Sequence, residues 1–192
     1  GIEFRIPYDT TGGYHTTGAG IYAGREDATA ASYGGHLAFY TRITGGAHTE
    51  KMRIDNAGNV GINETAPVTL MELSSTAPYL TIHNTTHEDG NYGREGKIIF
   101  RGEQSGGEET VLGELEFSHD GASDSQNGKF SLRVNDGDDG TSPSAAVTID
   151  SNLNVGLGDT DPSEAKLSIT GVAASDYGLK IDQDQNVSAL YI

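Results

Sequence analysis

The stretch from Met52 to Pro67, MRIDNAGNVGINETAP, recurs later in the chain as Val147 to Pro162, VTIDSNLNVGLGDTDP. The distance from Ile54 to Ile149 is 95 residues, and the two closing prolines keep the same spacing, so the copies align without a gap. Self-similarity at a fixed distance is the signature of a repeated structural unit. The sequence therefore predicts a fold that is built from copies of one module.

Weaker matches extend this register beyond the motif. Phe4-Arg5 corresponds to Phe100-Arg101, and Gly35, Leu37 and Phe39 correspond to Gly128, Phe130 and Leu132. The predicted organisation is a first module over residues 1–73, a second over 74–170 and the start of a third over 171–192. We interpret the chain as a piece of a longer polypeptide.

Seven segments alternate polar and apolar residues with a period of two, which is typical of strands with one buried face. They are Ile2–Arg5, His36–Tyr40, Lys51–Asp55, Tyr79–His83, Glu114–Ser118, Lys129–Val134 and Lys166–Ile169. Clusters of Gly, Asn and Asp separate them and favour tight turns, because these residues adopt a positive φ at low cost. No stretch carries an apolar helical stripe with capping residues. The expected fold is all-β, made of elongated repeat modules.

The motif itself predicts a turn between two short strands. Ile54 and Val60 flank an Asn-rich segment in which Asp55 and Asn56 are expected to hydrogen-bond the turn backbone. Pro67 and Pro162 are expected to end the strand and redirect the chain, because proline cannot donate to a ladder. The residues predicted to make this structural motif in the two copies are Ile54, Asp55, Asn59, Val60, Gly61, Ile62, Pro67, Ile149, Asp150, Asn154, Val155, Gly156, Leu157 and Pro162.

The supply of apolar side chains is small. Leu, Ile, Val and Phe make up about a fifth of the chain, which is at the margin for independent folding. Each strand offers only two or three of them. Burying one contributes about 1.5–3 kcal/mol, whereas ordering the backbone costs about 1–2 kcal/mol per residue. A lone module would be marginal, so we expect several identical chains to share their apolar faces in an intertwined homotrimeric β-prism or triple β-helix.

Charge and composition exclude several classes of function. The chain carries 28 acidic and 12 basic side chains, a net charge of −16, which opposes binding to nucleic acid through its phosphates. There is no cysteine, which excludes disulfides and thiolate metal sites. No apolar run reaches the length of a membrane-spanning helix. We therefore expect neither nucleic acid nor membrane insertion, and no cofactor.

The motif Met52–Ile62, which closes with Ala66-Pro67, and the segment His36–Arg42 ahead of it resemble the shaft modules of bacteriophage tail fibres and related viral appendage proteins. The second copy resembles them more closely at Gly156–Pro162. The resemblance covers essentially the whole chain. It implies a trimeric, extracellular fibre shaft in the virion that positions a distal receptor-binding tip, with other fibre or baseplate proteins as partners. Such shafts often end in a receptor-binding tip or an autoproteolytic chaperone domain.

Other functions remain as alternatives: a glycan-binding module or adhesin filament on a cell surface, and a polysaccharide depolymerase. Glu103, Glu108, Glu109, Glu114 and Glu116 offer paired carboxylates of the kind that glycoside hydrolases use. However, Glu114 and Glu116 alternate with apolar residues, as on a solvent-facing strand, and we do not expect an enzyme. A glycan site would use tyrosines, which number nine, but packing on a thin rod also explains them. Those in or near turns are Tyr8, Tyr14, Tyr22, Tyr33 and Tyr92.

Two patterns point weakly to metal ions. Asn135–Thr141 resembles an oxygen-ligand calcium loop, but Ala146 stands where an EF-hand carries glutamate, so an acidic turn is favoured. His83 and His87 have the spacing of a helical metal pair, which loses its meaning in a strand and turn. His119 is interpreted as a polar residue at a strand end. No metal site is expected.

Overall fold

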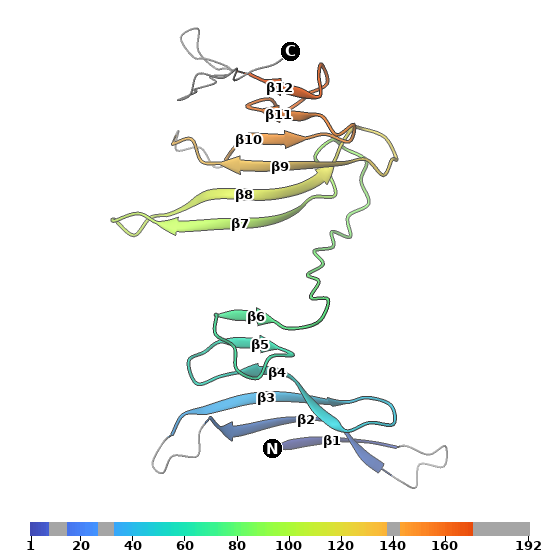
Figure 1. Cartoon of the computed structure of the whole chain (residues 1–192), viewed down its shortest axis with the longest axis vertical. Coiled ribbons are helices and arrows are strands. Elements are labelled where there is room, and N and C mark those ends of the chain that lie inside the picture. The colour runs from blue at the N-terminus through green and yellow to red at the C-terminus, as the bar shows by residue number, and fades with distance from the viewer. Residues whose placement is uncertain (8–14, 27–32, 138–142, 171–192) are drawn as a thin grey trace, which may run out of the picture. The chain divides into compact units, whose positions relative to one another are not determined.

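The computed structural model describes residues 1–7, 15–26, 33–137 and 143–170. Over these ranges the chain forms strands and no helix, and the strands make two sheets of six strands each (Figure 1). The chain divides into two compact units, Gly1–Leu80 and Thr81–Ile192. The expectation of an all-β fold is confirmed. None of the described residues forms a helix that could span a membrane.

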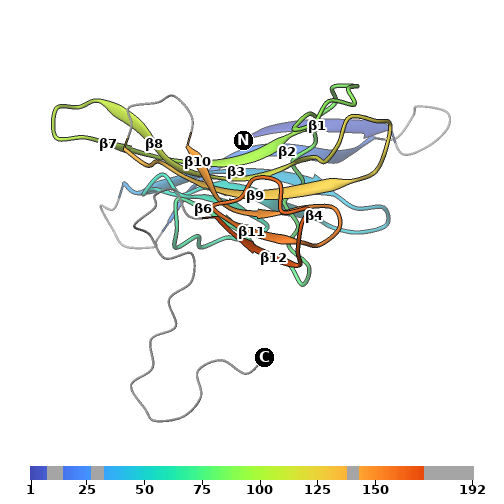
Figure 2. The ribbon, with the colours of Figure 1, turned by 90° about the horizontal axis from the view of Figure 1, so that it is seen from above.

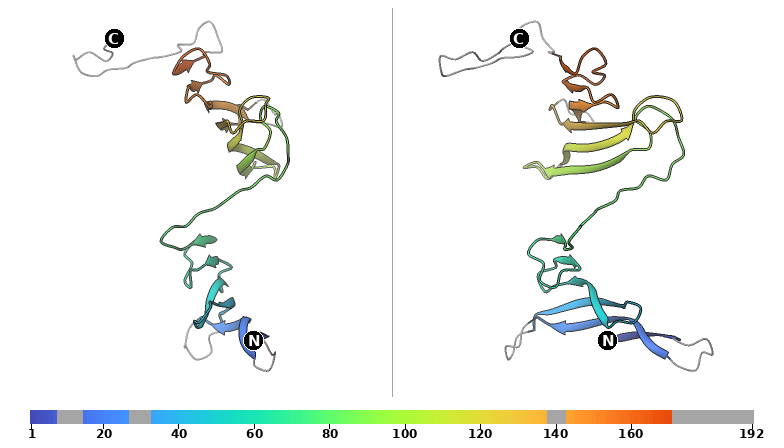
Figure 3. Two further views of the ribbon diagram at one scale, coloured as in Figure 1. Left: turned by 90° about the vertical axis from the view of Figure 1, so that its right-hand side faces the viewer. Right: turned by 45° about the vertical axis from the view of Figure 1, so that its right-hand side comes forward.

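Both sheets have the same topology, with strands that lie side by side in chain order. The first contains β1 (Ile2–Pro7), β2 (His15–Arg25), β3 (Gly35–Arg42), β4 (His48–Ile54), β5 (Val60–Ile62) and β6 (Met71–Leu73). The second contains β7 (Gly96–Glu103), β8 (Glu109–His119), β9 (Gly128–Val134), β10 (Ser144–Ile149), β11 (Val155–Leu157) and β12 (Leu167–Ile169). Neighbouring strands are antiparallel except the last pair of each sheet, which is parallel. Each sheet is a single layer (Figure 3), and the β7–β8 hairpin extends past β11 and β12 (Figure 2).

The two sheets share their irregularities as well as their order. The pairing of β1 with β2 shifts register between Phe4 and Arg5, and that of β7 with β8 shifts between Phe100 and Arg101. A second bulge skips Lys51 in β4 and Ala146 in β10, which are 95 residues apart. Because a bulge fixes the local twist and register of a strand, the repeat seen in the sequence is reproduced strand by strand.

Some expectations about individual segments are wrong. Tyr79–His83, expected as a strand, forms none and lies exposed between β6 and β7. The glycine- and threonine-rich strand β2 was not expected, and neither was β7. The first compact unit ends at Leu80, and the expected module boundary at residue 73 stays a prediction. The expected third module, 171–192, lies outside the described residues.

One face of the first sheet is apolar from edge to edge. The cross-strand pairs Ile21–Phe39, Phe39–Met52 and Met52–Ile62 follow one another across four strands. Side chains that pair directly across strands lie on the same face, so these residues form a continuous surface. We call it the apolar face of the first unit, and its members are Ile2, Phe4, Ile21, Leu37, Phe39, Met52, Ile54, Val60, Ile62, Met71 and Leu73.

The second sheet repeats this arrangement. Leu115 pairs with Leu132, which pairs with Val147, and Phe117 pairs with Phe130, their ring centroids 5.1 Å apart. The members of the apolar face of the second unit are Ile98, Phe100, Leu115, Phe117, Phe130, Leu132, Val147, Ile149, Val155, Leu157, Leu167 and Ile169. In both units the side chains that alternate with these lie on the opposite face, called the polar face below.

Burial is inverted relative to an ordinary globular domain. Among the described residues the fully buried apolar side chain is Ala38, whereas Phe117 is 65% exposed and Phe4 is 51% exposed. The buried polar side chains are Glu116, Ser118, His119, Lys129, Ser131, Thr148, Asp150 and Asn154. A soluble domain normally buries the first class and exposes the second. In the second unit the described segments therefore cover polar side chains, and in both units they leave large apolar side chains exposed.

Candidate functional site

The motif in the first unit forms a turn between β4 and β5 that is held by one carboxylate. Oδ1 of Asp55 accepts hydrogen bonds from the backbone N–H groups of Ala57 (2.9 Å) and Asn59 (2.8 Å), and Oδ2 accepts one from Nδ2 of Asn59 (3.1 Å). Partial desolvation raises the pKa of Asp55, but these hydrogen bonds outweigh it and lower the pKa below its ordinary value. Asn59 also donates to the carbonyl oxygen of Pro67 (3.2 Å). The expected bonding by Asp55 is present, and its side-chain partner is Asn59.

The second unit repeats this turn atom by atom. Asp150 accepts from the N–H groups of Asn152 (2.9 Å) and Asn154 (2.8 Å) and from Nδ2 of Asn154 (3.0 Å). Both turns require a left-handed backbone conformation, with positive φ, at the fourth residue counted from the aspartate. Gly58 occupies it in the first unit at φ 86°, but Leu153 occupies it in the second at φ 61°. The side chain of Leu153 is 75% exposed, so it gains little packing for this strained backbone.

A crossover connection follows each turn and passes over the middle residue of the short strand. A Cβ atom at Gly61 would lie 2.2 Å from the carbonyl oxygen of Glu64, and one at Gly156 would lie 2.3 Å from that of Asp159. Val60 and Ile62 point to the apolar face, so Gly61 between them faces the polar side. The crossover therefore lies on the polar face, and the apolar face stays uncovered.

The two prolines of the motif lie within this crossover connection. Strands β5 and β11 end at Ile62 and Leu157, before Pro67 and Pro162, so the expectation that these prolines end the strands is wrong. Both prolines are buried within the connection to the parallel strand. The carbonyl of Pro67 is fixed by Asn59, which ties the crossover to the turn. The remaining motif residues lie in β4, β5, β10 and β11 or in the two turns.

An ion-pair network occupies the polar face of the second unit. Glu116, 1% exposed, lies between Nζ of Lys97 (3.3 Å) and Nε of Arg133 (3.0 Å). Burial raises the pKa of Glu116, but the charges of Arg133 and Lys97 outweigh it and lower the pKa. Glu114 contacts the same lysine at 3.6 Å. The expectation that Glu114 and Glu116 face solvent is thus wrong for Glu116, whose partners are neighbours on adjacent strands.

His119, at the end of β8, is 2% exposed and joins two loops. Its Nδ1 lies 3.1 Å from the carbonyl oxygen of Gly90, and its Nε2 lies 3.0 Å from Oγ of Ser125. Beside it, Lys129 pairs with Asp120 (3.1 Å) and lies over the ring of Tyr92 (4.4 Å from Nζ to the centroid). These contacts tie the loops around residues 90 and 125 to the end of β8.

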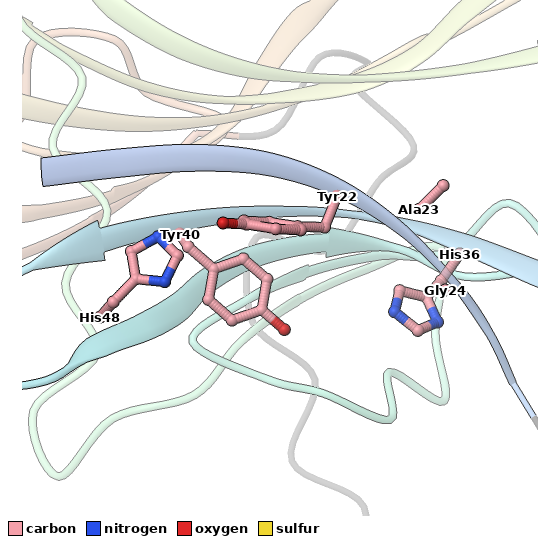
Figure 4. A pocket seen from close by; sticks show the side chains of 6 residues that line it. All are labelled: Tyr22, Ala23, Gly24, His36, Tyr40 and His48. Carbon is pink, nitrogen blue, oxygen red and sulfur yellow. The ribbon is translucent and has the colours of Figure 1, made fainter. Parts of the chain in front are cut away.

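The polar face of the first unit carries a cavity of about 370 Å³ beside a group of ion pairs that Arg53 makes with Glu50 and Glu26. It is lined by Tyr22, Ala23, Gly24, His36, Tyr40 and His48. Figure 4 shows Tyr22, Tyr40 and His48 gathered together, with His36 apart from them beside Gly24. The rings of Tyr40 and His48 stack with centroids 5.1 Å apart, and Tyr22 meets Tyr40 edge-on at 5.1 Å. Sequence reasoning named Tyr22 as a sugar-binding candidate but did not connect it with these partners.

The structure does not assemble the metal patterns of the sequence. Within the described part of the chain, no three His, Asp or Glu side chains come together as a metal site. His83 and His87 are exposed in a segment without strands. In the acidic turn, Asn135 caps the N–H of Gly137 (2.8 Å) and Asp136 accepts from Ser144 (2.7 Å). Residues 138–142 of that turn, and Tyr8 and Tyr14, lie outside the described residues.

Comparison with known proteins gives distant structural matches. No protein-family model matches the sequence. No curated protein matches it either. A solved structure of the carboxy-terminal domain of the bacteriophage T5 L-shaped tail fibre matches with a TM-score of 0.32 and 12% identity, over 91% of this chain and 85% of that one. The same domain with its intra-molecular chaperone domain matches with a TM-score of 0.33 and 12% identity, over 97% of this chain and 60% of that one. These scores are low and do not establish a shared function.

Leu153→Asn is expected to stabilise the protein by about 0.5–1 kcal/mol, because asparagine tolerates the left-handed backbone that strains leucine. Gly58→Ala at the equivalent turn is expected to destabilise it by a similar amount, since no atom lies within 4 Å of a Cβ there and the backbone angle alone opposes the change. Thermal unfolding at one fixed chain concentration measures both. Equal effects of the same sign would contradict this account of the turns.

Gly61→Ala is expected to lower stability by about 1–3 kcal/mol, because the new methyl group would meet the backbone carbonyl of Glu64 and the crossover would have to move. Gly106→Ala is the control, since no atom lies within 4 Å of its Cβ position. Calorimetric midpoints of the two variants should differ clearly. A Gly61→Ala variant as stable as the control would show that the close approach carries no constraint.

Acid is expected to destabilise the second unit through Glu116. Its folded pKa lies below the ordinary value of 4.5, so its stabilising contribution is present above pH 4.5 and is lost as the pH falls through the folded value. Glu116→Gln should lower the unfolding midpoint at pH 7 and flatten its decline below pH 4.5. The exposed Glu103 supplies the control Glu103→Gln, which should keep the wild-type pH profile. An unchanged profile in Glu116→Gln would contradict this role.

Proposed function

We propose that this chain is a structural segment of a trimeric extracellular fibre shaft, of the kind found in viral tail fibres, which holds a distal receptor-binding tip away from its base. The observation that carries the proposal is the uncovered apolar face of each unit. Both faces span a complete six-stranded sheet, and the described chain does not cover either of them. Burying one large apolar side chain contributes about 1.5–3 kcal/mol, so a partner on these faces would supply the missing core.

A second copy of the same chain is the partner that fits best. It offers an apolar face of the same width and strand register, and it does so twice along the chain, as a shaft of repeated modules requires. Copies that each carry a net charge of −16 repel one another, so they would associate through uncharged surfaces. Three sheets whose apolar faces meet on a common axis form a closed prism. The resemblance of Met52–Pro67 to tail-fibre shaft modules supports this number and the virion location.

The proposed role is mechanical and uses no catalytic residue. The crossovers and the ion-paired side chains of Lys97, Glu116 and Arg133 lie on the polar faces, which would point outward. The same physical argument applies to an adhesin filament on a bacterial surface. Other fibre or baseplate proteins would attach through the ends of the shaft.

Light scattering coupled to size exclusion measures the mass of the assembled chain, and we expect three times the 20.2 kDa of one chain. Phe117→Lys is expected to break the trimer or lower its unfolding midpoint, because three charges would meet at the axis. Ile99→Lys is the matched control. Ile99 is 45% exposed and pairs with Glu114 on the polar face of the neighbouring strand, where a lysine is tolerated.

Sedimentation velocity on both variants at equal concentration completes the test. A trimer that is lost in Phe117→Lys and kept in Ile99→Lys would support the proposal. A stable monomer of the wild-type chain, a dimer, or a trimer unaffected by Phe117→Lys would each overturn it.

A further inference from the structure

The polar faces of the two units differ although their apolar faces repeat. Tyr22 occupies the position in the first sheet that Glu116 occupies in the second. Tyr22 pairs with Ala38, two residues before Tyr40, and Glu116 pairs with Ser131, two residues before Arg133. Tyr40 in turn stands where the second unit has Arg133. At these two positions the ion pair of Glu116 with Arg133 is thus replaced by the ring pair of Tyr22 and Tyr40 beside a cavity. Assembly through the apolar face does not require this cluster, which suggests a separate role.

The aromatic rings are held rigidly by acidic partners. The hydroxyl of Tyr22 donates to Oε1 of Glu3 (2.6 Å), and that of Tyr40 donates to Oε2 of Glu50 (2.9 Å). Glu50 is itself fixed by Nε of Arg53 (2.7 Å). A binding surface with fixed rings loses little conformational entropy when a ligand arrives. The cluster is therefore preorganised.

Two glycines allow the rings to lie against the sheet. A Cβ atom at Gly20 would be 2.3 Å from the ring of Tyr22, and one at Gly24 would be 2.6 Å from the ring of His36. Each ring therefore covers a glycine with one side. Both rings also line the cavity, which is open on the polar face. The result is a platform of aromatic surface on the sheet.

Polar atoms without partners lie in and next to the same cavity. Nε2 of His48 is buried from solvent and makes no hydrogen bond. Nδ1 of His36 and Oε1 of Glu26 make no hydrogen bond either, but they lie 3.6 Å apart as an ion pair. Buried polar atoms in native proteins are nearly always hydrogen-bonded, so such atoms call for a bound group. That group must offer several hydrogen-bonding hydroxyls and a flat apolar side.

We propose that this cavity binds a neutral sugar ring of a surface polysaccharide. The apolar side of a pyranose would lie on the ring of Tyr22, with Tyr40 edge-on beside it, and its hydroxyl groups would hydrogen-bond with His36 and His48. The carboxylates of Glu3, Glu26 and Glu50 around the site, and the charge of the chain, disfavour acidic sugars. The site lies on the face opposite the apolar face, so it stays accessible when copies assemble. The proposal goes beyond the structural role and does not depend on the number of copies.

A printed array of neutral hexose and N-acetylhexosamine oligosaccharides, with sialylated and uronic-acid counterparts, tests the full chain. The best neutral oligosaccharide is then titrated calorimetrically. His48→Phe keeps a ring against Tyr40 but removes the unpartnered nitrogen, and we expect about fivefold to tenfold weaker affinity. Tyr22→Ala should abolish binding. Tyr33→Ala is the control, because Tyr33 is 95% exposed and does not line the cavity.

Sedimentation of each variant separates a loss of binding from a loss of assembly. If Tyr22→Ala fails to assemble, His48→Phe and ¹⁹F spectra of the 3-fluorotyrosine-labelled wild-type chain with the same oligosaccharide still decide the matter. Neutral binding that the control keeps and the cavity variants lose would support the proposal. No binding to any neutral oligosaccharide, a preference for acidic ones, or affinity unchanged in His48→Phe and Tyr22→Ala would each overturn it. The mass of the assembly tests the shaft role independently.

Discussion

The lack of a side chain at Gly61 and Gly156 is the constraint on which the structure depends. A parallel strand must be reached by a connection that crosses back over the sheet, and here the strand is only three residues long, so the connection is short. The glycine lets the carbonyl of Glu64 or Asp159 approach the strand from the polar side. Because the crossover lies on that side, no described part of the chain covers the apolar side. The turn carboxylates Asp55 and Asp150 fix where each crossover begins.

The two faces then have different physical tasks. The apolar face offers non-directional attraction to any apolar surface of the same size, and that attraction sets the need for a partner. The polar face in the second unit contains buried charges, which are costly unless each is paired, as Glu116 is with Lys97 and Arg133. Such networks contribute little net stability, but they allow few alternative arrangements. The second unit thus gains its own order from polar contacts and leaves its large apolar side chains exposed.

Sequence reasoning succeeded where structure is local. The turn around Asp55 and Asn59 involves residues four apart, and its repetition made it visible. Reasoning failed where contacts come from distant strands. The alternation of Glu116 with Phe117 indicated one solvent face, but Lys97 and Arg133 reach Glu116 from neighbouring strands. Strand β2 was not predicted because its glycines and threonines obscure the alternation of polar and apolar residues. Tyr79–His83 was assigned as a strand because its alternation is real, yet no segment of the described chain pairs with it.

The aromatic cavity could not be predicted from the sequence for a related reason. Tyr22, His36, Tyr40 and His48 come from three strands, and a bulge that skips Lys51 sets where β4 lies against β3. No spacing within one segment predicts that arrangement. The divergence of the two polar faces has a wider consequence. A chain made of tandem copies can change the polar face of one copy while both apolar faces stay the same, so new surface chemistry can arise without altering the surfaces that the proposed assembly would use.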